Sequence, residues 1–369
     1  MQILQLATAV PEKVYSTEEL LNAFPCSLPE SVRHNVTNLG VSTRHLLEQE
    51  HRPEAETVGS EDGLVDVCAN ACRRAIKGAG LSSADIDYLI VAYDASPFLS
   101  PGLSQILVPK LELDSHINHV NAQGAASTAF PKALELAQNR LALHPEDHVL
   151  ICVSGVSSYW FQNQVWGIKN VMEVSQISKI RDEDKKLLEL RKWVATIEFF
   201  LFGDGAASAI VANEGEGLAV KGIAEVTNLG KKDYLAGYSR LTALNEPFKF
   251  GFYSHLDKGI PDLGSKYTSM VLEELLRKNP DAIRRAKKWV VHTGSEKILN
   301  LLAERHHVER EKLRESHEVL NQYGNLAAAS LPFILEKTVR GNSLSKGDTV
   351  LMLGYGWGFS AAACLLEKT

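Results

Sequence analysis

The chain has 369 residues, of which 45% are hydrophobic, 7% aromatic and 23% charged, the composition of an ordinary globular protein. This composition excludes general disorder, and the length suits two similar domains or one large duplicated unit. The net charge of −6 gives no broad basic field, which argues against nucleic acid as a partner. No apolar run reaches the roughly 18 residues of a transmembrane helix, so we expect no membrane partner.

The N-terminal segment predicts a first strand rather than a signal peptide, because Glu12 follows a short apolar run that has no basic start. The five cysteines are scattered and odd in number, which favours a reduced, cytoplasmic setting. Cys68 and Cys72 are four residues apart in a helical pattern, but no further Cys or His completes a zinc set. Two buried helix thiols are therefore favoured over a metal pair, and we expect no metal site.

Three segments of the chain recur at an offset of 201 residues. Two of them are buried strands, and the third is a run of small residues that ends in proline and continues as a helix. The matched pairs are 147–153 with 348–354, 87–91 with 288–292, and 124–131 with 325–332. Agreement of three segments in the same order and register predicts an internal duplication.

The repeat predicts two βα-rich halves, residues 1–212 and 213–369. Alternating strand and helix signals predict mainly parallel central strands covered by helices. Residues 157–200 form an insert in the first half, aromatic at first and then charged. The charged part predicts a solvated helix. The aromatic part fits a lid, a dimer contact or a substrate wall, and the sequence does not decide among them.

Three polar residues fall at the carboxyl ends of predicted strands, where ligands collect in α/β sheets. Ser127 lies where a strand gives way to a helix, His292 closes a strand, and Asn325 precedes the second small-residue helix. The duplication brings these ends towards one centre, where the three side chains could meet. Each residue also has a purely structural interpretation: Ser127 as a helix cap, His292 as a core histidine and Asn325 as a turn residue.

At these residues the sequence resembles the thiolase superfamily, in the branch of ketoacyl-ACP synthase III and the type III polyketide synthases (chalcone synthase-like). The resemblance covers nearly the whole chain and rests on segments in the family's order. They are ATAVPEKVYSTEEL (7–20), GVSTRHL (40–46), FGDGAA (202–207), VHTG (291–294), YGN (323–325) and GYGWG (354–358). The resemblance implies an α/β, thiolase-like, duplicated five-layer α/β/α/β/α fold. It also places the family's histidine on His292 and its asparagine on Asn325.

The chain departs from this resemblance at the nucleophile, which in the family is the cysteine of glycine-x-glycine-cysteine-x-alanine. Ala133 to Ala137 (ALELA) anchor an alignment that places Ser127 on the cysteine. A rival register, anchored on Gln123-Gly124, places Ala125 there. We prefer Ser127, because the agreement downstream is more extensive than the agreement upstream. An engineered replacement of cysteine by serine would leave the same sequence.

A serine changes the chemistry that the resemblance implies. Its hydroxyl has a far higher pKa than a thiol and must lose its proton to a base as it attacks, a role for His292. The implied function is a thioester-dependent acyltransferase or condensing enzyme that forms an acyl-Ser127 intermediate in polyketide, fatty-acid-like or other secondary-metabolite biosynthesis. The candidate substrate-binding residues are Trp160, Phe161, Phe202, Gly356 and Trp357.

The resemblance further implies that the substrate is an acyl-CoA or acyl carrier protein thioester, that no cofactor is tightly bound, and that the protein is a dimer. The positions that hold basic residues for coenzyme A phosphates in type III synthases are about Ser31, His34 and Asn38 here, so a carrier protein stays an open alternative. The alternative function is a non-catalytic ketosynthase-like subunit that pairs with a cysteine-bearing paralogue. Loss of the cysteine favours this alternative, whereas retention of His292 and Asn325 favours an enzyme.

Overall fold

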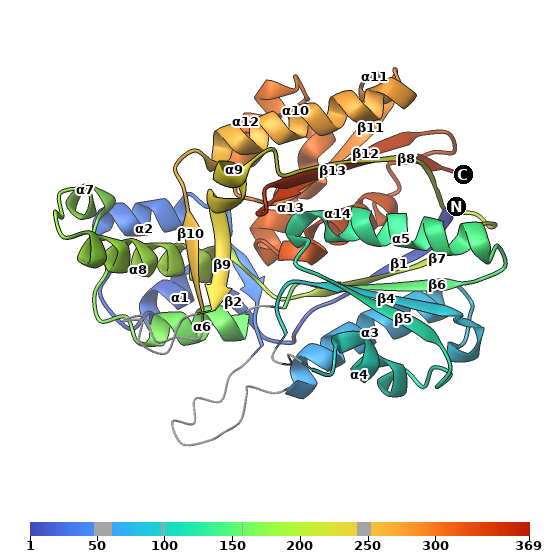
Figure 1. Cartoon of the computed structure of the whole chain (residues 1–369), viewed down its shortest axis with the longest axis horizontal. Coiled ribbons are helices and arrows are strands. Elements are labelled where there is room, and N and C mark those ends of the chain that lie inside the picture. The colour runs from blue at the N-terminus through green and yellow to red at the C-terminus, as the bar shows by residue number, and fades with distance from the viewer. Residues whose placement is uncertain (48–60, 97, 99, 157, 242–251) are drawn as a thin grey trace.

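The computed structural model describes residues 1–47, 61–96, 98, 100–156, 158–241 and 252–369, and it alternates strands with helices (Figure 1). The strands are β1 (Gln2–Ala9), β2 (Val14–Ser16), β3 (Thr43–His45), β4 (Tyr88–Tyr93), β5 (Asn118–Gln123), β6 (Val149–Ser154), β7 (Ala206–Ala212), β8 (Leu218–Thr227), β9 (Gly237–Leu241), β10 (Phe252–Leu256), β11 (Ala286–Val291), β12 (Thr349–Gly356) and β13 (Ser360–Lys368). The helices are α1 (Thr17–Ala23), α2 (Glu30–Thr37), α3 (Glu61–Gly78), α4 (Leu103–Lys110), α5 (Ala129–Leu143), α6 (Ser158–Trp166), α7 (Val174–Ile177), α8 (Glu183–Leu201), α9 (Lys231–Leu235), α10 (Ile260–Lys278), α11 (Ala282–Arg285), α12 (Glu296–Arg305), α13 (Arg314–Tyr323) and α14 (Ser330–Arg340), with 3₁₀ turns η1 (Ser83–Asp85), η2 (Ala126–Thr128), η3 (Arg310–Leu313) and η4 (Ala327–Ala329).

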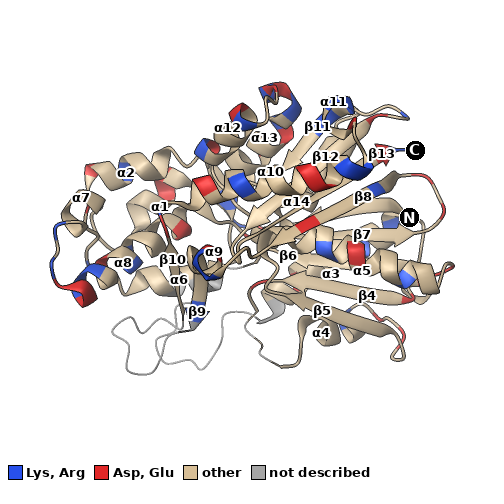
Figure 2. Cartoon of the chain, turned by 45° about the horizontal axis from the view of Figure 1, so that its top comes forward, with Lys and Arg blue, Asp and Glu red and all other residues tan. Residues whose placement is uncertain are grey.

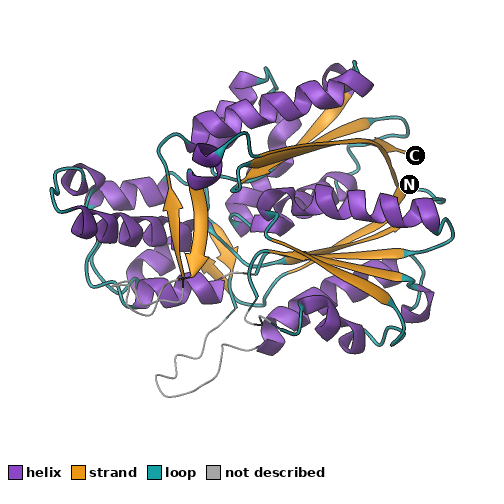
Figure 3. Ribbon diagram, viewed as in Figure 1, coloured by secondary structure: helices purple, strands orange, loops and turns teal. Residues whose placement is uncertain are grey.

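A nine-stranded sheet in the order β11-β12-β13-β8-β1-β7-β6-β4-β5 organises the molecule. At its centre β1 pairs with β7 along its length, but it pairs with β8 through Gln2–Ala219 and Ile3–Leu218 at one end. The sheet therefore divides into two half-sheets that are joined at that end and splay apart, as Figure 3 shows. Among the described strands of this sheet, parallel pairing occurs only towards the outer edges, where β4 lies between β5 and β6 and where β11 pairs with β12. The central strands β6, β7, β1, β8, β13 and β12 pair antiparallel in that order, so the prediction of mainly parallel central strands is wrong for the centre of the sheet.

Helices fill the space between the half-sheets and cover both outer faces (Figure 1). α5 and α14 lie in the middle, α3 and α4 cover the half-sheet of the first half, and α10 and α12 cover that of the second. The inner face of α5 is apolar at helical spacing and fully buried. This arrangement confirms the predicted α/β, five-layer thiolase-like fold.

The duplication extends to backbone detail. From their outer edges to the centre, the half-sheets read β4-β6-β7-β1 and β11-β12-β13-β8, with β5 added in the first half. The 201-residue offset carries η2 onto η4 and the first residue of α5 onto that of α14. It also carries Ala126, at φ +44°, onto Ala327, at φ +46°. A left-handed alanine is uncommon, so its repetition at the same offset confirms the duplicated design.

The insert of the first half helps to build a separate lobe. α6 and α8 pack with α1, α2 and β10 around a shared apolar core, and α7 packs against α8 (Figure 1). The charged part of the insert, residues 179–193, leads into α8 and forms its first turns, which are exposed or half-buried except at Glu189, as expected of a solvated helix. The residues that follow it, from Val194 to Phe200, are almost entirely buried. The proposed division at residue 212 falls between β7 and β8 and stays a prediction.

The distribution of charged residues and the character of the helices agree with the composition of a globular protein. Figure 2 shows both signs of charge on the outer helices, while the strands of both half-sheets carry few charges. Within the described ranges, none of the helices combines the length and the apolar character that crossing a bilayer requires.

Candidate active site

Ser127 lies in a strained turn between β5 and α5. Gly124 (φ +78°) and Ala126 (φ +44°) both have left-handed backbone, and the second costs about 1–2 kcal/mol for a residue with a Cβ atom. The backbone N–H of Ala126 donates a 2.8 Å hydrogen bond to Oδ1 of Asp94. Asp94 directly follows β4, and the pairing of Tyr93 with Gln123 brings the ends of β4 and β5 together. The sheet register therefore supplies the acceptor that holds the turn.

The hydroxyl of Ser127 meets the imidazole of His292. Oγ of Ser127 is 2.8 Å from Nε2 of His292, and the two residues are 6% and 4% exposed. They come from opposite halves of the chain, because His292 follows β11 and its N–H donates to the carbonyl of Leu353 on β12. The structure thus brings together two of the three polar residues that the sequence singled out. This distance is what a serine nucleophile and its general base need.

Burial determines the state of His292. Desolvation lowers the pKa of the imidazole to about 3, so the ring is neutral at pH 7. Its Nδ1 is buried and has no hydrogen-bond partner among the described residues. Because no bond fixes either tautomer, Nε2 is able to accept from Ser127 in one tautomer and to donate in the other. The imidazole therefore becomes a strong base only when negative charge develops beside it.

Asn325 is placed by the FGDG turn of the first half. Its N–H donates to Leu201 and its carbonyl accepts from Gly203, so the segment pairs with Phe202 as a short parallel bridge. Gly324 (φ +73°) permits this approach, because a Cβ atom there would come within 2.7 Å of the Leu201 carbonyl. Two segments that resemble the family, FGDG and YGN, are thus direct neighbours.

The side chain of Asn325 is connected to the neighbour of His292. Its Oδ1 accepts from the N–H of Ala327 at 2.8 Å and from Oγ of Ser330 at 3.4 Å. Ser330 in turn accepts from the hydroxyl of Thr293, which directly follows His292. In the part of the chain that is described, Nδ2 of Asn325 makes no hydrogen bond and no bond joins Asn325 to Ser127. The amide donor is therefore unused in this state.

The glycine-rich segment at the end of β12 lies over Ser127. A Cβ atom on Gly356 would be 3.1 Å from Oγ of Ser127, and one on Gly354 would collide with the Ser127 carbonyl. Gly354 therefore permits close packing of the two halves, and the lack of a side chain on Gly356 leaves space next to the hydroxyl of Ser127. Trp357, in the same segment, lies against β9: its indole Cδ1 is 2.9 Å from where a Cβ of Gly237 would be, and its role in substrate binding stays a prediction.

Two of the predicted aromatic residues form a cluster next to Asn325. Phe161 on α6 stacks on Phe202 with ring centroids 4.7 Å apart, and it also contacts Phe252 on β10 at 5.8 Å. Phe202 is the bridge partner of Asn325. The side chain of Trp160, another predicted substrate-binding residue, lies outside the described part of the structure.

Sequence reasoning missed two carboxylates that shape the site. Asp94 holds the Ser127 turn, and burial raises its pKa to about 6. Asp204, fully buried, accepts from the N–H groups of Leu47 and Ser158. The available signals were a carboxylate directly after the buried run YLIVAY and the aspartate of FGDG. Neither residue's partner is near it in sequence, so neither role could be assigned from the sequence.

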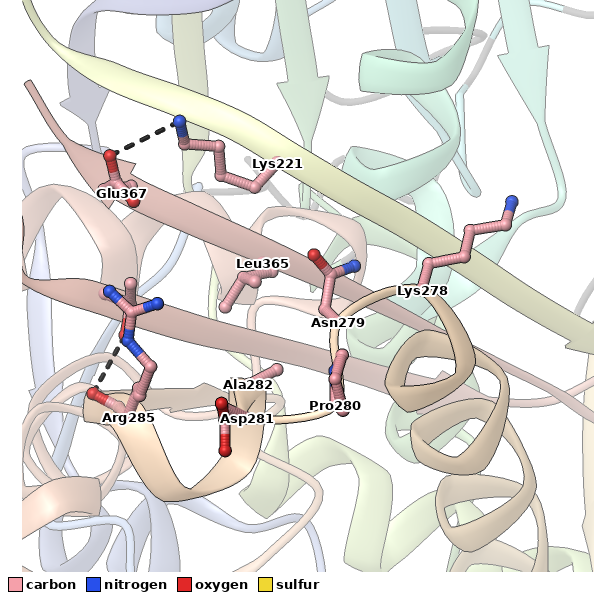
Figure 4. A pocket seen from close by; sticks show the side chains of 10 residues that line it. Lys221, Lys278, Asn279, Pro280, Asp281, Ala282, Arg285, Leu365 and Glu367 are labelled. Carbon is pink, nitrogen blue, oxygen red and sulfur yellow. Dashed lines mark hydrogen bonds and ion pairs between the residues drawn. The ribbon is translucent and has the colours of Figure 1, made fainter.

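Figure 4 shows a pocket of about 320 Å³ elsewhere on the molecule. It lies between the end of α10, α11 and the strands of the second half, and Thr349 at the start of β12 lines it. The Ser127 turn packs at the other end of β12. This pocket therefore does not belong to the Ser127–His292 site.

Comparison with known proteins agrees with this fold. Residues 279–368 match the family described as 3-oxoacyl-[acyl-carrier-protein] synthase III, C terminal. A 3,5-dihydroxyphenylacetyl-CoA synthase of Amycolatopsis orientalis is 24% identical over 98% of this chain and 92% of that protein. A β-ketoacyl-[acyl-carrier-protein] synthase III of Clostridium perfringens is 25% identical over 85% of this chain and 87% of its own length. The crystal structure of 1,3,6,8-tetrahydroxynaphthalene synthase from Streptomyces coelicolor, 21% identical, superposes with a TM-score of 0.79 over 100% of this chain and 99% of that one.

The chain therefore has a duplicated five-layer, thiolase-like fold. In sequence it is similar to ketoacyl-ACP synthase III and to synthases of the type III polyketide class. The serine at position 127 distinguishes it from the cysteine that the resemblance implies there.

Proposed function

We propose that the protein is a ketoacyl synthase III-like acyltransferase or condensing enzyme that transfers an acyl group from a thioester to Ser127. The donor is acyl-CoA or an acyl carrier protein, and no tightly bound cofactor takes part. The observation that carries the proposal is the 2.8 Å contact between the Ser127 hydroxyl and His292 Nε2. Relatives named as synthases of acyl-CoA and acyl-carrier products support the thioester chemistry.

In the acylation step, Oγ of Ser127 attacks the thioester carbonyl carbon while its proton moves to Nε2 of His292. The carbon–sulfur bond of the tetrahedral intermediate then breaks. The departing thiolate takes the proton from Nε2, leaving an acyl-serine ester and a free thiol. The N-terminal end of α5 faces the negative charge that develops on the carbonyl oxygen and stabilises it. Buried, neutral His292 suits this step because it receives the proton only as that charge forms.

A condensation step uses the donors that remain. Once Ser127 is acylated it no longer donates to Nε2, and His292 can carry its proton there because Nδ1 has no partner among the described residues. Nε2–H and the unused Nδ2 of Asn325 are then the two donors for the carbonyl oxygen of an incoming thioester. They stabilise the enolate that forms on that oxygen when the carbon–carbon bond to an α-carboxylate of the incoming thioester breaks and CO2 leaves. The enolate carbon then attacks the acyl-serine carbonyl, the bond between that carbonyl and Oγ breaks, and Oγ of Ser127 takes up a proton from solvent.

The proposal is tested by intact-protein mass spectrometry after incubation with a panel of acyl-CoA and acyl-carrier thioesters. An acyl adduct on the native chain that is lost in Ser127→Ala is the expected result, and its mass identifies the starter group. No adduct from any donor, together with tight association to a cysteine-bearing paralogue, would instead establish the non-catalytic subunit. Light scattering on the same sample tests the proposed dimer; cytoplasmic location also stays a prediction.

A further inference from the structure

The lobe beside the active site contains a buried carboxyl group that the mechanism above does not use. Glu198, on the last turns of α8, is 1% exposed, and neither of its carboxyl oxygens has hydrogen-bond geometry with a described residue. Its neighbour Ser254 on β10 already shares a 2.8 Å hydrogen bond with Ser239. Burial raises the pKa of Glu198 to about 8, against a smaller opposing hydrogen-bond effect of the nearby Ser254 hydroxyl, whose geometry is too poor for a full bond. At pH 7 this side chain is mainly a neutral carboxylic acid.

A second unused polar atom lies against the same strand. Gln164 on α6 is 0% exposed, and its Nε2 donates to the carbonyl of Phe252 at 2.9 Å. That bond fixes the amide, and its Oε1 is left without a partner among the described residues. Phe252 and Ser254 are two residues apart on β10, which places Gln164 and Glu198 against neighbouring positions of one strand. Burying such atoms unpaired is costly, about 1–3 kcal/mol for each group.

A chain of contacts connects this polar pair to the active site. Glu198 is one helical turn before Phe202, whose backbone pairs with Asn325. Phe161 contacts both Phe202 and Phe252, and Gln164 donates to the carbonyl of Phe252. Packed aromatic rings therefore lead from Asn325 towards Gln164 and Glu198. An apolar wall with a few polar groups at its end is the usual form of a small-molecule site.

We propose that Glu198 and Gln164 form the distal end of the acyl-binding site and bind a hydroxyl group on the acyl chain of the substrate. A hydroxyl satisfies both side chains: its O–H donates to Oε1 of Gln164, and its oxygen accepts from the carboxylic acid of Glu198. A plain hydrocarbon chain would leave both atoms unpaired. The proposal rests on the function proposed above for the choice of acyl chain, but the distal site is testable without any chemistry at Ser127.

Equilibrium binding to the unmodified protein is the first test. Titration calorimetry compares 4-propylphenol with propylbenzene, and 8-hydroxyoctanoate with octanoate. The hydroxylated compound of at least one pair should bind about tenfold more tightly, and Glu198→Leu and Gln164→Leu should each remove that preference. Thr196→Val is the matched control, because its buried hydroxyl on the same helix is already bonded to the carbonyl of Lys192. Equal binding within both pairs, or a preference that survives both leucine variants, would overturn the proposal.

Stability provides a second, independent measurement. If Glu198 is kept for binding, Glu198→Leu should raise the melting temperature, because it removes a buried carboxyl group without a partner among the described residues. The folded pKa of Glu198 lies above its usual 4.5, so the native chain holds this proton more tightly than the unfolded one. Its contribution to stability therefore falls as pH rises from about 4.5 to 8, and Glu198→Leu should flatten that part of the profile. A lower melting temperature in Glu198→Leu would show a structural role and would contradict the proposal.

Acylation separates this proposal from the proposed function. Mass spectrometry with 3-phenylpropanoyl-CoA and 3-(4-hydroxyphenyl)propanoyl-CoA measures whether the hydroxyl also accelerates adduct formation on Ser127. A binding preference without any adduct would keep the distal site and reject the acyltransferase. Adducts at equal rates from both thioesters, with no binding preference, would keep the acyltransferase and reject the distal site.

Discussion

The two turns that begin the inner helices have the same backbone but different supports. In the first half, the left-handed Ala126 donates its N–H to Asp94, which comes from the end of a neighbouring strand. In the second half, the left-handed Ala327 donates to Asn325, two residues before it in the same turn. The position that corresponds to Asn325 in the first half is Gly124, which has no side chain to offer.

This difference shows how the two halves of a duplicated fold contribute different residues to one site. The first half takes its acceptor from β4 and presents Ser127 at the position where the second half has Ala328. The second half contributes His292, and it uses the oxygen of Asn325 for its own turn while the nitrogen makes no bond to a described residue. Under the proposed function, one half therefore supplies the nucleophile, and the other supplies the base and the amide donor.

The largest expected effect comes from substitutions at the corresponding positions 127 and 328 of the two halves. Ser127→Ala should abolish the acyl adduct, a loss of at least about a thousandfold in acylation rate, because no other side chain replaces the nucleophile. Ala328→Ser, the matched variant in the second half, should create no new adduct, since His292 contacts the Ser127 turn. Peptide mapping of the adduct checks both variants, and label on the peptide that contains position 328 would contradict the assigned division.

Replacing the base should be nearly as severe. His292→Gln should slow acylation by about a hundred- to ten-thousandfold, the usual contribution of a general base. Because the pKa of His292 is lowered to about 3, acylation by the native chain should show no decline near pH 6.5 that is due to this residue. The depressed pKa also means that its contribution to stability is lost as pH falls from about 6.5 to 3. Rate–pH and melting–pH profiles of the two proteins measure these effects.

Asn325 allows its two functions to be separated. Asn325→Asp keeps the oxygen that accepts from Ala327 and removes the Nδ2 donor, whereas Asn325→Ala removes both. The aspartate variant should fold and form the acyl adduct, but its condensation rate should fall by about a hundredfold. The alanine variant should also lose stability. Equal condensation in the native chain and Asn325→Asp would exclude the amide from the reaction.

Asp94 should have a smaller effect that depends on its acceptor. Asp94→Ala removes the partner of the Ala126 N–H and should slow acylation by about tenfold, because the strained turn relaxes. Asp94→Asn keeps an acceptor and should stay close to the native rate. Since the pKa of Asp94 is raised to about 6 and a protonated carboxyl still accepts through its carbonyl oxygen, the native rate should change little as pH falls below about 6. A decline there in the native chain that is absent in Asp94→Asn would show that the turn needs the negative charge of Asp94 as well as its acceptor.

The sequence was sufficient for the features that local patterns encode. The repeated strands and small-residue helices are continuous apolar runs, and their common offset revealed the duplication. Ser127, His292 and Asn325 follow predicted strands or turns, which made them candidates. The support that Asp94 gives to Ala126 could not be predicted, because it depends on the register of β4 with β5. The 201-residue offset carries β5 onto the end of α13, so a strand in the first half corresponds to a helix in the second. The sequence could not predict this difference, because tertiary packing overrides local preference.

Two glycines at the 201-residue offset provide the finest test of the comparison. Gly155 follows β6 and Gly356 ends β12, and each lies against the turn of the opposite half. A Cβ on Gly155 would collide with the backbone carbonyl of Leu326, which cannot move away without shifting η4. A Cβ on Gly356 would be 3.1 Å from Oγ of Ser127, a hydroxyl that can rotate.

Gly155→Ala should therefore lower the melting temperature, whereas Gly356→Ala should leave it nearly unchanged. The second variant should instead slow acylation by about three- to tenfold, because the rotated hydroxyl no longer points at His292. Thermal melts and adduct kinetics on both variants measure the two effects separately. If Gly356→Ala had a lower melting temperature and a native acylation rate, the close packing of β12 on the Ser127 turn would contribute to stability and not to acylation. A lower melting temperature in Gly155→Ala together with slower acylation in Gly356→Ala would show that Gly155 is kept for packing and Gly356 for access to the nucleophile.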